Sequence, residues 1–263
     1  MRAVRGNDRR GSAAQKGGQV TIGVQLYSVR AALQEGSPDD VLERLAAMGY
    51  GFVEPTFGLV NGDAPGFRRL LDEHGLTVSS LHGPALGPLR PQIAEAAHVL
   101  GADTVVVPAI PDADFVTAAG VARSAERLAE AADSLAALGL RLAYHNHHWE
   151  LANHPGGQAG LELLAALLPA EVALEVDVYW AAVGGADVPA LLRDLGDRVR
   201  LLHVKDGPAT VDDAMTAVGS GTLAIPEILA ASPKALRIVE LDRCDGDVFD
   251  ALAESLAYLK ELP

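Results

Sequence analysis

Acidic and imidazole side chains follow four short apolar runs, at the point where each run ends. The four segments are YHNHHWE, EVDVYW, LLHVKD and IVELD, in that order along the chain. Val-, Leu- and Ile-rich runs of this length are typical of buried parallel strands, whose polar ends would meet at one rim. The side chains expected there are His145, His147, Glu150, Asp177, His203 and Glu240. Such ligands suit a divalent cation such as Mn2+, Mg2+, Co2+ or Zn2+.

The segment from Tyr144 to Glu150 carries three histidines and a glutamate in seven residues. In a strand, alternate side chains share a face, so His145 and His147 should point the same way and Asn146 the other way. Glu150 lies in the loop just beyond and could fold back over the rim. A lone histidine is more often a solvated or core residue, but this density at a strand end favours a functional site.

Asp177 ends an apolar run, where an acid costs free energy unless it is paired or bound to a metal. Its alternative role is that of an ordinary helix N-cap or turn residue. Glu175 shares the face of Asp177 by the two-residue period of a strand, so one of the two is a candidate structural partner rather than a ligand.

His203 and Lys205 share one face of the next predicted strand. An imidazole can ligate a metal, and Lys205 offers a cation for a substrate hydroxyl, oxyanion or phosphate. The alternative for Lys205 is a surface ion pair with Asp206, of small energetic worth. Glu240 follows the last apolar run and would complete a ligand set with Glu150, Asp177 and His203.

Further residues at the predicted rim are candidates for substrate binding. They are Glu54 and His82 from the first half of the chain, and the aromatic residues Tyr27, Trp149 and Trp180. The aromatic rings could form an apolar platform for the face of a sugar. The alternatives are salt-bridge or turn residues for the first two, and plain core residues for the rings.

The elements that must position these residues alternate regularly. Strand-like runs are expected at residues 20–26, 52–54, 77–81, 104–107, 140–144, 172–176, 199–204 and 236–239. A helix-like segment follows each run, and the last is expected at residues 249–262. In 263 residues this pattern predicts an α/β protein with a single (β/α)8 TIM barrel at residues 19–263. An open doubly wound sheet is the alternative, but the first strand is followed by Gln25-Leu26-Tyr27-Ser28 rather than a glycine-rich nucleotide fingerprint.

Composition narrows the class of protein. The formal net charge of −14 repels phosphate backbones, so a nucleic acid is not an expected partner. Cys244 is the single cysteine, which excludes an intrachain disulfide and fits a cytoplasmic protein. No apolar stretch approaches the roughly 18–20 residues of a membrane span. Residues 1–18 are basic and lack the hydrophobic stretch of a secretory signal; we predict a disordered arm.

With these residues in place, the chain resembles the sugar phosphate isomerase/epimerase group of xylose isomerase-like TIM barrels. That superfamily also holds inosose dehydratases and endonuclease IV. The resemblance runs from about Ile22 to Leu259. It rests on GVQLYSVR, the HGP turn at His82, YHNHHWE, EVDVYWA followed by Gly184-Gly185, LLHVKD, VGSG at Val218–Gly221, and IVELD.

The resemblance implies a divalent metal held by four side chains, one from each of the last four strands. Three of them match Asp177, His203 and Glu240. Many relatives have a glutamate where this chain has His145, so either His145 ligates directly or Glu150 reaches in, and we expect Glu150. Ser220 stands where relatives commonly have a glutamate, so the function of that carboxylate is absent here.

The implied reaction is isomerisation or epimerisation of a sugar or sugar phosphate. The metal would polarise the carbonyl and stabilise an enediolate, while a base moves the proton on the neighbouring carbon. Candidate acid and base residues are Glu240, Glu150, His145 and His147. A lyase that dehydrates a keto-inositol or 3-keto-sugar is the main alternative. A DNA-repair endonuclease and a metal-free sugar-binding barrel are further alternatives. The sequence leaves the oligomeric state open, although a homodimer is common for this architecture.

Overall fold

Every strand runs parallel to its neighbours, in the sheet order β3-β2-β1-β9-β8-β7-β6-β5-β4. The strands are β1 (Ile22–Gln25), β2 (Phe52–Glu54), β3 (Thr77–Val78), β4 (Leu81–His82), β5 (Thr104–Val107), β6 (Arg141–His145), β7 (Ala173–Asp177), β8 (Val199–Val204) and β9 (Leu236–Val239). The structure is a computed structural model and describes residues 21–263. The arm predicted at residues 1–18 therefore lies outside the described residues.

The sheet closes into a barrel because β3 and β4 are two parts of one strand. Both parts follow β2: the amide of Ser79 donates to Val53 O at 3.2 Å, and that of His82 donates to Pro55 O at 3.0 Å. On the other side β4 pairs with β5, and the first and last strands, β1 and β9, pair with each other. The predicted (β/α)8 barrel is confirmed, with its third strand interrupted at Ser79-Ser80.

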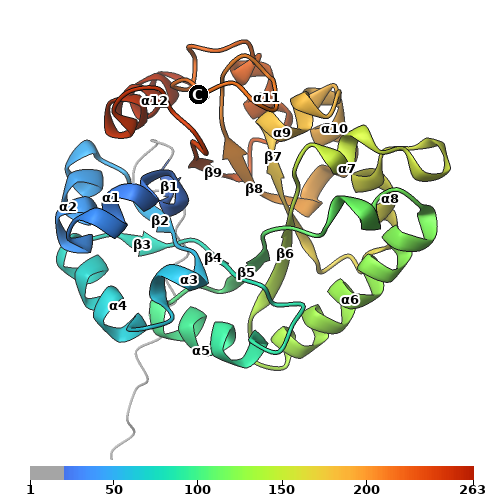
Figure 1. Cartoon of the computed structure of the whole chain (residues 1–263), viewed down its shortest axis with the longest axis horizontal. Helices are drawn as coiled ribbons and strands as arrows, with labels where there is room; N and C mark the ends of the chain where they lie inside the picture. Colours follow the sequence, from blue (N-terminus) through green and yellow to red (C-terminus); the bar gives the residue numbers. More distant parts are fainter. Residues whose placement is uncertain (1–20) are drawn as a thin grey trace, which may run out of the picture.

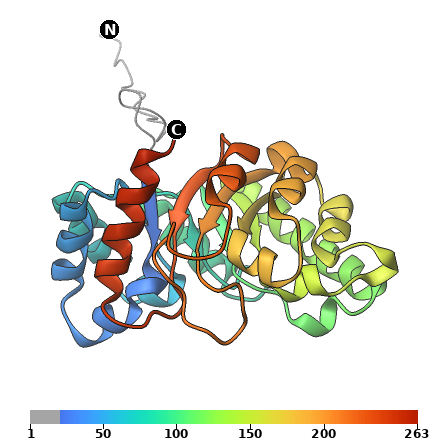
Figure 2. The same ribbon diagram turned by 90° about the horizontal axis from the view of Figure 1, so that it is seen from above.

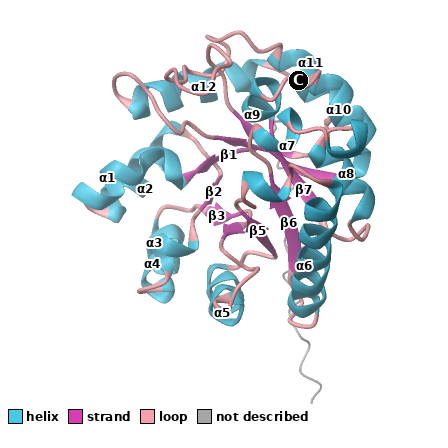
Figure 3. Ribbon diagram, turned by 45° about the vertical axis from the view of Figure 1, so that its right-hand side comes forward, coloured by secondary structure: helices cyan, strands magenta, loops and turns pink. Residues whose placement is uncertain are grey.

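The helices surround the strands on the outside of the barrel (Figures 1 and 3). They are α1 (Arg30–Glu35), α2 (Pro38–Met48), α3 (Phe57–Val60), α4 (Ala64–Glu73), α5 (Arg90–Leu100), α6 (Ala118–Ala136), α7 (Trp149–Ala152), α8 (Gly160–Leu167), α9 (Val178–Val183), α10 (Val188–Leu195), α11 (Ile225–Ala231) and α12 (Val248–Glu261). The C-terminal helix α12 packs beside the first strand–helix unit, as Figure 2 shows. Among the described residues, no helix is long and apolar enough to cross a membrane.

Local sequence signals fix most of these helices. The side chain of Ser37 caps α2 by accepting from the amide of Asp39, and Gly49 ends the helix with φ of 100°. The short helices α1, α3, α7 and α9 were not predicted from the sequence. Two of them matter for the site, because α7 and α9 follow the C-terminal ends of β6 and β7.

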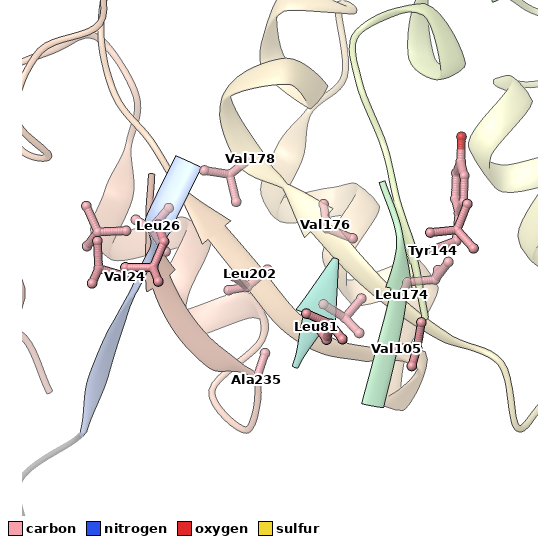
Figure 4. Packing of buried hydrophobic residues seen from close by; sticks show 14 of the residues in the cluster. Val24, Leu26, Leu81, Val105, Tyr144, Leu174, Val176, Val178, Leu202 and Ala235 are labelled. Atoms are coloured by element: carbon pink, nitrogen blue, oxygen red, sulfur yellow. The ribbon is translucent and has the colours of Figure 1, made fainter. Parts of the chain in front are cut away.

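Apolar side chains pack on both faces of the sheet. The larger cluster lies between strands and helices and includes Val105, Tyr144, Leu174 and Leu202 (Figure 4). A smaller cluster fills the barrel interior: Phe52, Val106, Ala143, Ala173, Leu201 and Ile238. The absence of a side chain at Gly23 makes room for the ring of Phe52, because a Cβ there would lie 2.0 Å from it.

Most residues of the interior cluster lie two positions before a polar residue. The pairs are Phe52 and Glu54, Ala143 and His145, Ala173 and Glu175, Leu201 and His203, and Ile238 and Glu240. Because alternate residues of a strand share a face, these polar side chains also point into the barrel, nearer the C-terminal ends of the strands. The barrel therefore has an apolar floor and a polar mouth.

Candidate metal centre

Within residues 21–263, two groups of four buried side chains bring possible ligand atoms within 4.8 Å of one another. The rim group consists of His145, Asp177, His203 and Glu240. The deep group consists of His82, His145, Glu175 and His203. The two groups therefore share two histidines.

The rim group brings together the three ligands that the sequence suggested on the last three strands. His203 Nδ1 lies 2.7 Å from Glu240 Oε2, and His145 Nε2 lies 3.8 Å from Asp177 Oδ2. The register of the sheet explains part of this meeting, since Asp177 and His203 are paired across β7 and β8. Their role as metal ligands stays a prediction.

Asp177 combines both roles that its sequence position allowed. Its Oδ1 atom caps α9 by accepting from the amide of Trp180 at 2.9 Å. Its Oδ2 atom is buried in the rim group and lies 2.9 Å from Lys205 Nζ. Burial raises the pKa of Asp177 to about 6, although Lys205 and His203 act against that rise. One oxygen thus anchors the residue to α9, and the other belongs to the rim group.

The structure places Glu150, which we expected to reach in as a ligand, outside the rim group. Glu150 lies in α7, where its Oε2 atom accepts from the amide of His147 at 2.9 Å and its Oε1 atom accepts from the hydroxyl of Tyr144. Tyr144 belongs to the cluster outside the barrel, so this carboxyl group is turned away from the interior. His145 takes the place at the end of β6 that we had expected Glu150 to fill.

Lys205 lies among three carboxylates at the barrel mouth and is 1% exposed. Its Nζ atom is 2.9 Å from Asp177 Oδ2, 2.6 Å from Glu240 Oε2 and 2.7 Å from Asp242 Oδ2. Burial alone would lower the pKa of Lys205, but the carboxylates raise it well above its ordinary value. The alternative of a surface ion pair between Lys205 and Asp206 is wrong.

Asp206 points instead to the loop that follows β8 and organises it. Its Oδ1 atom accepts from the amides of Gly207 at 2.8 Å and Leu223 at 3.1 Å. Its Oδ2 atom accepts from the amides of Gly219 at 3.0 Å and Gly221 at 3.1 Å. The aspartate therefore fixes the VGSG segment, a role that sequence reasoning missed because its partners lie up to 17 residues away.

The two glutamates beneath the rim, Glu54 and Glu175, are completely buried and bind histidines. Glu54 Oε2 lies 2.6 Å from His203 Nε2. Glu175 Oε2 lies 2.6 Å from His82 Nε2 and 3.1 Å from His145 Nδ1. Glu54 and His82, expected to bind substrate, thus contact other protein side chains, although His82 also lines the cavity described below.

The same burial has opposite outcomes for these two glutamates. Burial would raise the pKa of Glu54, but the positive charges of His82 and His203 lower it to about 2. Burial and repulsion from Glu54 raise the pKa of Glu175 to about 7. The negative charge beneath the rim is therefore carried mainly by Glu54.

A cavity of about 430 Å3 opens onto the rim group. Much of its wall is apolar and comes from Tyr27, Phe57, Pro84, Pro108 and Trp180. His145 and His147 both line it, with ring centroids 5.2 Å apart, so they face the same space as predicted. The ring of His147 stacks on that of Trp149 at 4.3 Å. Burial, followed by the charge of Lys205, lowers the pKa of His147 to about 4.

An α/β barrel with buried carboxylates and imidazoles at the C-terminal ends of its strands has the architecture of a barrel enzyme. The chain belongs to the xylose isomerase-like TIM barrel family, whose family model matches residues 42–232. This finding confirms the resemblance that the sequence segments indicated.

Solved structures share the fold over nearly the whole chain. A sugar phosphate isomerase/epimerase from Parabacteroides distasonis aligns with a TM-score of 0.79 and 24% identity, covering 99% of each chain. The probable 3-DHS dehydratase AsbF from Bacillus anthracis gives 0.71 and 14%, covering 91% of this chain and 98% of that one. A D-allulose 3-epimerase from Methylomonas sp. gives 0.67 and 16%, covering 92% and 98%. At these identities the likeness shows the fold alone. No curated protein matches the chain.

Proposed function

We propose that this protein is a metal-dependent isomerase or epimerase that moves a proton on the carbon next to the carbonyl group of a sugar. One observation carries the proposal: ligand atoms from four different strand ends converge in the rim group, beside a cavity large enough for a sugar. The mixture of enzymes with this fold, isomerases, epimerases and a dehydratase, is compatible with such chemistry.

The donor atoms of the rim group fit a divalent cation. Two imidazoles and two carboxylates are ligands that Mn2+, Co2+ and Zn2+ accept, whereas Mg2+ prefers oxygen alone. Asp177 Oδ2 and His203 Nδ1 are buried, and their nearest partners are Lys205 Nζ at 2.9 Å and Glu240 Oε2 at 2.7 Å. Three carboxylates surround the single ammonium of Lys205, and buried negative charge in excess of its partners supports a bound cation. A bound cation would supply positive charge next to the oxygen of the substrate that becomes negative during proton transfer.

Glu240 and His147 are the proposed proton-transfer residues. Both line the cavity, and they come from the ends of β9 and β6, which lie three strands apart around the barrel. Two groups on different sides of a substrate could remove a proton from one face and return one to the other, as epimerisation requires. One of them would suffice for isomerisation.

The charges around the cavity favour a sugar without a phosphate group. Among the described residues, Lys205 is the one lysine or arginine that lines the cavity. Its ammonium already contacts Asp177, Glu240 and Asp242. A phosphate group would therefore meet more carboxylate than cationic charge here, which costs electrostatic energy.

A lyase acting on a keto-inositol or a 3-keto-sugar is the second candidate. The buried ammonium of Lys205 favours it, because its positive charge beside the cavity could stabilise the negative charge of a departing hydroxyl group. Isomerase and lyase share the first proton removal and differ in whether water leaves.

The test is proton exchange in heavy water. Purified protein loaded with Mn2+ or Zn2+ is incubated with a panel of free ketoses, their phosphates and 3-keto-sugars, and the products are analysed by NMR and ultraviolet absorbance. We expect deuterium to enter a free sugar at the carbon next to the carbonyl. Loss of water with an ultraviolet-absorbing product would select the lyase instead.

Two variants control this experiment. Asp177→Asn should abolish exchange, because it removes a carboxylate from the rim group. Asp197→Asn should retain it, since Asp197 is exposed and lies just before β8, at the other end of the barrel. If no candidate substrate exchanges deuterium with the metal-loaded wild type, the proposed function is wrong.

A further inference from the structure

Each of the two histidines shared by the rim and deep groups turns one ring nitrogen toward the rim group and the other toward a buried glutamate beneath it. His203 turns Nδ1 toward Glu240 and Nε2 toward Glu54. His145 turns Nε2 toward Asp177 and Nδ1 toward Glu175. The inner nitrogen of each ring is hydrogen-bonded to a carboxyl group, whereas the rim-facing nitrogens lie beside carboxylates of the rim group, His203 Nδ1 at 2.7 Å from Glu240 Oε2 and His145 Nε2 at 3.8 Å from Asp177 Oδ2.

We infer that Glu54 and Glu175 are positioning residues that set the tautomers of the two histidines, so that His203 presents Nδ1 and His145 presents Nε2 to a bound cation. The inference rests on the proposed function in one respect: it concerns the same cation.

For His203 the tautomer follows from a chain of hydrogen bonds that begins at a backbone amide. The amide of Tyr27 can only donate, so the atom of Gln25 that it binds at 3.1 Å must be the oxygen. The nitrogen of the Gln25 side chain therefore donates to Glu54 Oε2 at 2.9 Å, while the hydroxyl of Ser80 binds the other oxygen. A carboxylate held by such donors accepts from Nε2 of His203 as well. The remaining nitrogen, Nδ1, lies 2.7 Å from Glu240 Oε2, where its lone pair would meet a cation bound in the rim group.

In His145 the roles of the two ring nitrogens are exchanged: Nδ1 faces the buried Glu175 and Nε2 faces the rim group. Glu175 Oε2 lies between two imidazoles, 2.6 Å from His82 Nε2 and 3.1 Å from His145 Nδ1. When Nδ1 of His145 donates to this oxygen, the lone pair of Nε2 faces Asp177 Oδ2, 3.8 Å away. That distance is too long for a hydrogen bond, and both atoms are acceptors. A cation between them would give His145 Nε2 a partner and add to the contact that Asp177 Oδ2 makes with Lys205.

The same hydrogen bonds argue against a second cation in the deep group. A neutral imidazole has one lone pair and one N–H. Cations in both groups would need both nitrogens of His145 and of His203 as ligands, and therefore two rings stripped of their N–H protons. Glu54 and Glu175 can instead accept hydrogen bonds from the histidine rings, and this requires no second cation. Carboxylates that accept from the second nitrogen of a ligand histidine orient the ring and increase its basicity.

The first test reads the tautomers directly. The full-length protein is labelled with 15N in its histidines, loaded with Zn2+, and studied by long-range 1H–15N correlation NMR, with His145→Gln and His203→Gln used to assign the signals. We expect the hydrogen of His203 on Nε2 and that of His145 on Nδ1. A hydrogen on the opposite nitrogen of either ring overturns the inference. This measurement uses the wild-type fold and needs no substrate.

The second test measures Zn2+ affinity by competition with a chelator. Glu54→Gln and Glu175→Gln should each weaken binding by about 10- to 100-fold, because the remaining amide cannot hold the ring as a carboxylate does. Asp197→Asn, which removes one negative charge from the exposed opposite end, should bind as the wild type does. Unchanged affinity in both glutamine variants overturns the inference.

The two proposals can fail separately. Correct tautomers and weakened variants without deuterium exchange in any sugar would remove the proposed function and leave the positioning role intact. Exchange by the wild type combined with the opposite tautomers would do the reverse. A wild-type protein that binds no Zn2+ would overturn both.

Discussion

The Nζ atom of Lys205 lies 2.6 Å from the Oε2 atom of Glu240, and both side chains are buried at the mouth of the barrel. This contact places a fixed positive charge next to a proposed metal ligand. Asp177 and Asp242 contact the same ammonium. Lys205 and a cation in the rim group would therefore share the task of neutralising buried carboxylates.

Replacing Lys205 with methionine should make neutralisation of the buried carboxylates depend more strongly on a bound cation. Breaking a buried ion pair by removing one partner costs about 3–5 kcal/mol of stability, so the free energy of unfolding in EDTA should fall by that amount. Because Zn2+ or Mn2+ would replace part of the lost charge, the metal should raise the melting temperature of the variant more than that of the wild type. Equal metal-dependent shifts in calorimetry would contradict this account of Lys205.

The position of His145, rather than Glu150, in the rim group gives a second prediction. His145→Ala should weaken Zn2+ binding by more than 100-fold, because it removes a ligand of the rim group (about 3 kcal/mol at 1.4 kcal/mol per tenfold change). Glu150→Gln should leave the affinity unchanged, since its carboxyl group binds Tyr144 and His147 instead. Chelator competition measures both, and the reverse order of effects would restore Glu150 as the ligand.

Glu150 should instead control stability as the pH changes. Burial raises the pKa of Glu150 from 4.5 to about 8 in the folded protein. The folded state therefore keeps this proton between about pH 4.5 and 8 while the unfolded chain has lost it, so the stability that the proton supplies falls as the pH rises through this window.

Glu150→Gln removes that dependence. At about 1.4 kcal/mol for each pKa unit, the free energy of unfolding of the variant should rise by a few kcal/mol relative to that of the wild type between about pH 5 and pH 8. Urea unfolding of both proteins at the two pH values measures the gain. A difference between the proteins that does not change with pH would show that the carboxyl group is ionised in the folded state.

The loop after β8 should depend on Asp206. Asp206→Asn replaces an oxygen that accepts backbone hydrogen bonds with an amide that donates, so two bonds from among Gly207, Gly219, Gly221 and Leu223 are lost or strained. We expect a loss of about 2–4 kcal/mol in stability. Hydrogen exchange should quicken at the glycine and leucine amides of the loop; unchanged protection there would argue against this role.

Tyr27 lines the cavity and remains 43% exposed, as a ring that contacts a substrate would be. Tyr27→Ala should raise the KM for the substrate by roughly 2- to 10-fold, which corresponds to the 0.5–1.5 kcal/mol of a stacked aromatic contact. Tyr27→Phe keeps the ring and serves as the matched variant, with a KM near that of the wild type. If both variants raise KM equally, the hydroxyl group rather than the ring is the contact.

Much of the barrel could be predicted because its signals are local. The strands Phe52–Glu54, Thr104–Val107, Val199–Val204 and Leu236–Val239 have the bounds expected from the sequence. Apolar runs, helix caps and glycine stops each lie within a few residues of the element they define. The two-residue period of a strand also predicted that His145 and His147 would face one space.

The short helices α7 and α9 were missed because contacts from other parts of the fold stabilise them. The hydroxyl group of Tyr144 draws Glu150 away from the rim, and the cap from Asp177 starts the helix that carries Trp180. Helices of four and six residues carry too few periodic positions to be recognised from sequence. Which of two nearby acids would reach the rim could therefore not be predicted.

The sequence by itself determined the order of strands and helices and the residues at the strand ends, because side-chain alternation and capping depend on neighbours along the chain. Only the tertiary structure decided which of those residues touch. The hydrogen bonds that link Gln25, Glu54 and His203 join residues up to 149 positions apart, and the position of each atom depends on closure of the barrel. The division of the polar mouth into a rim group and a deep group is accordingly a property of the closed barrel.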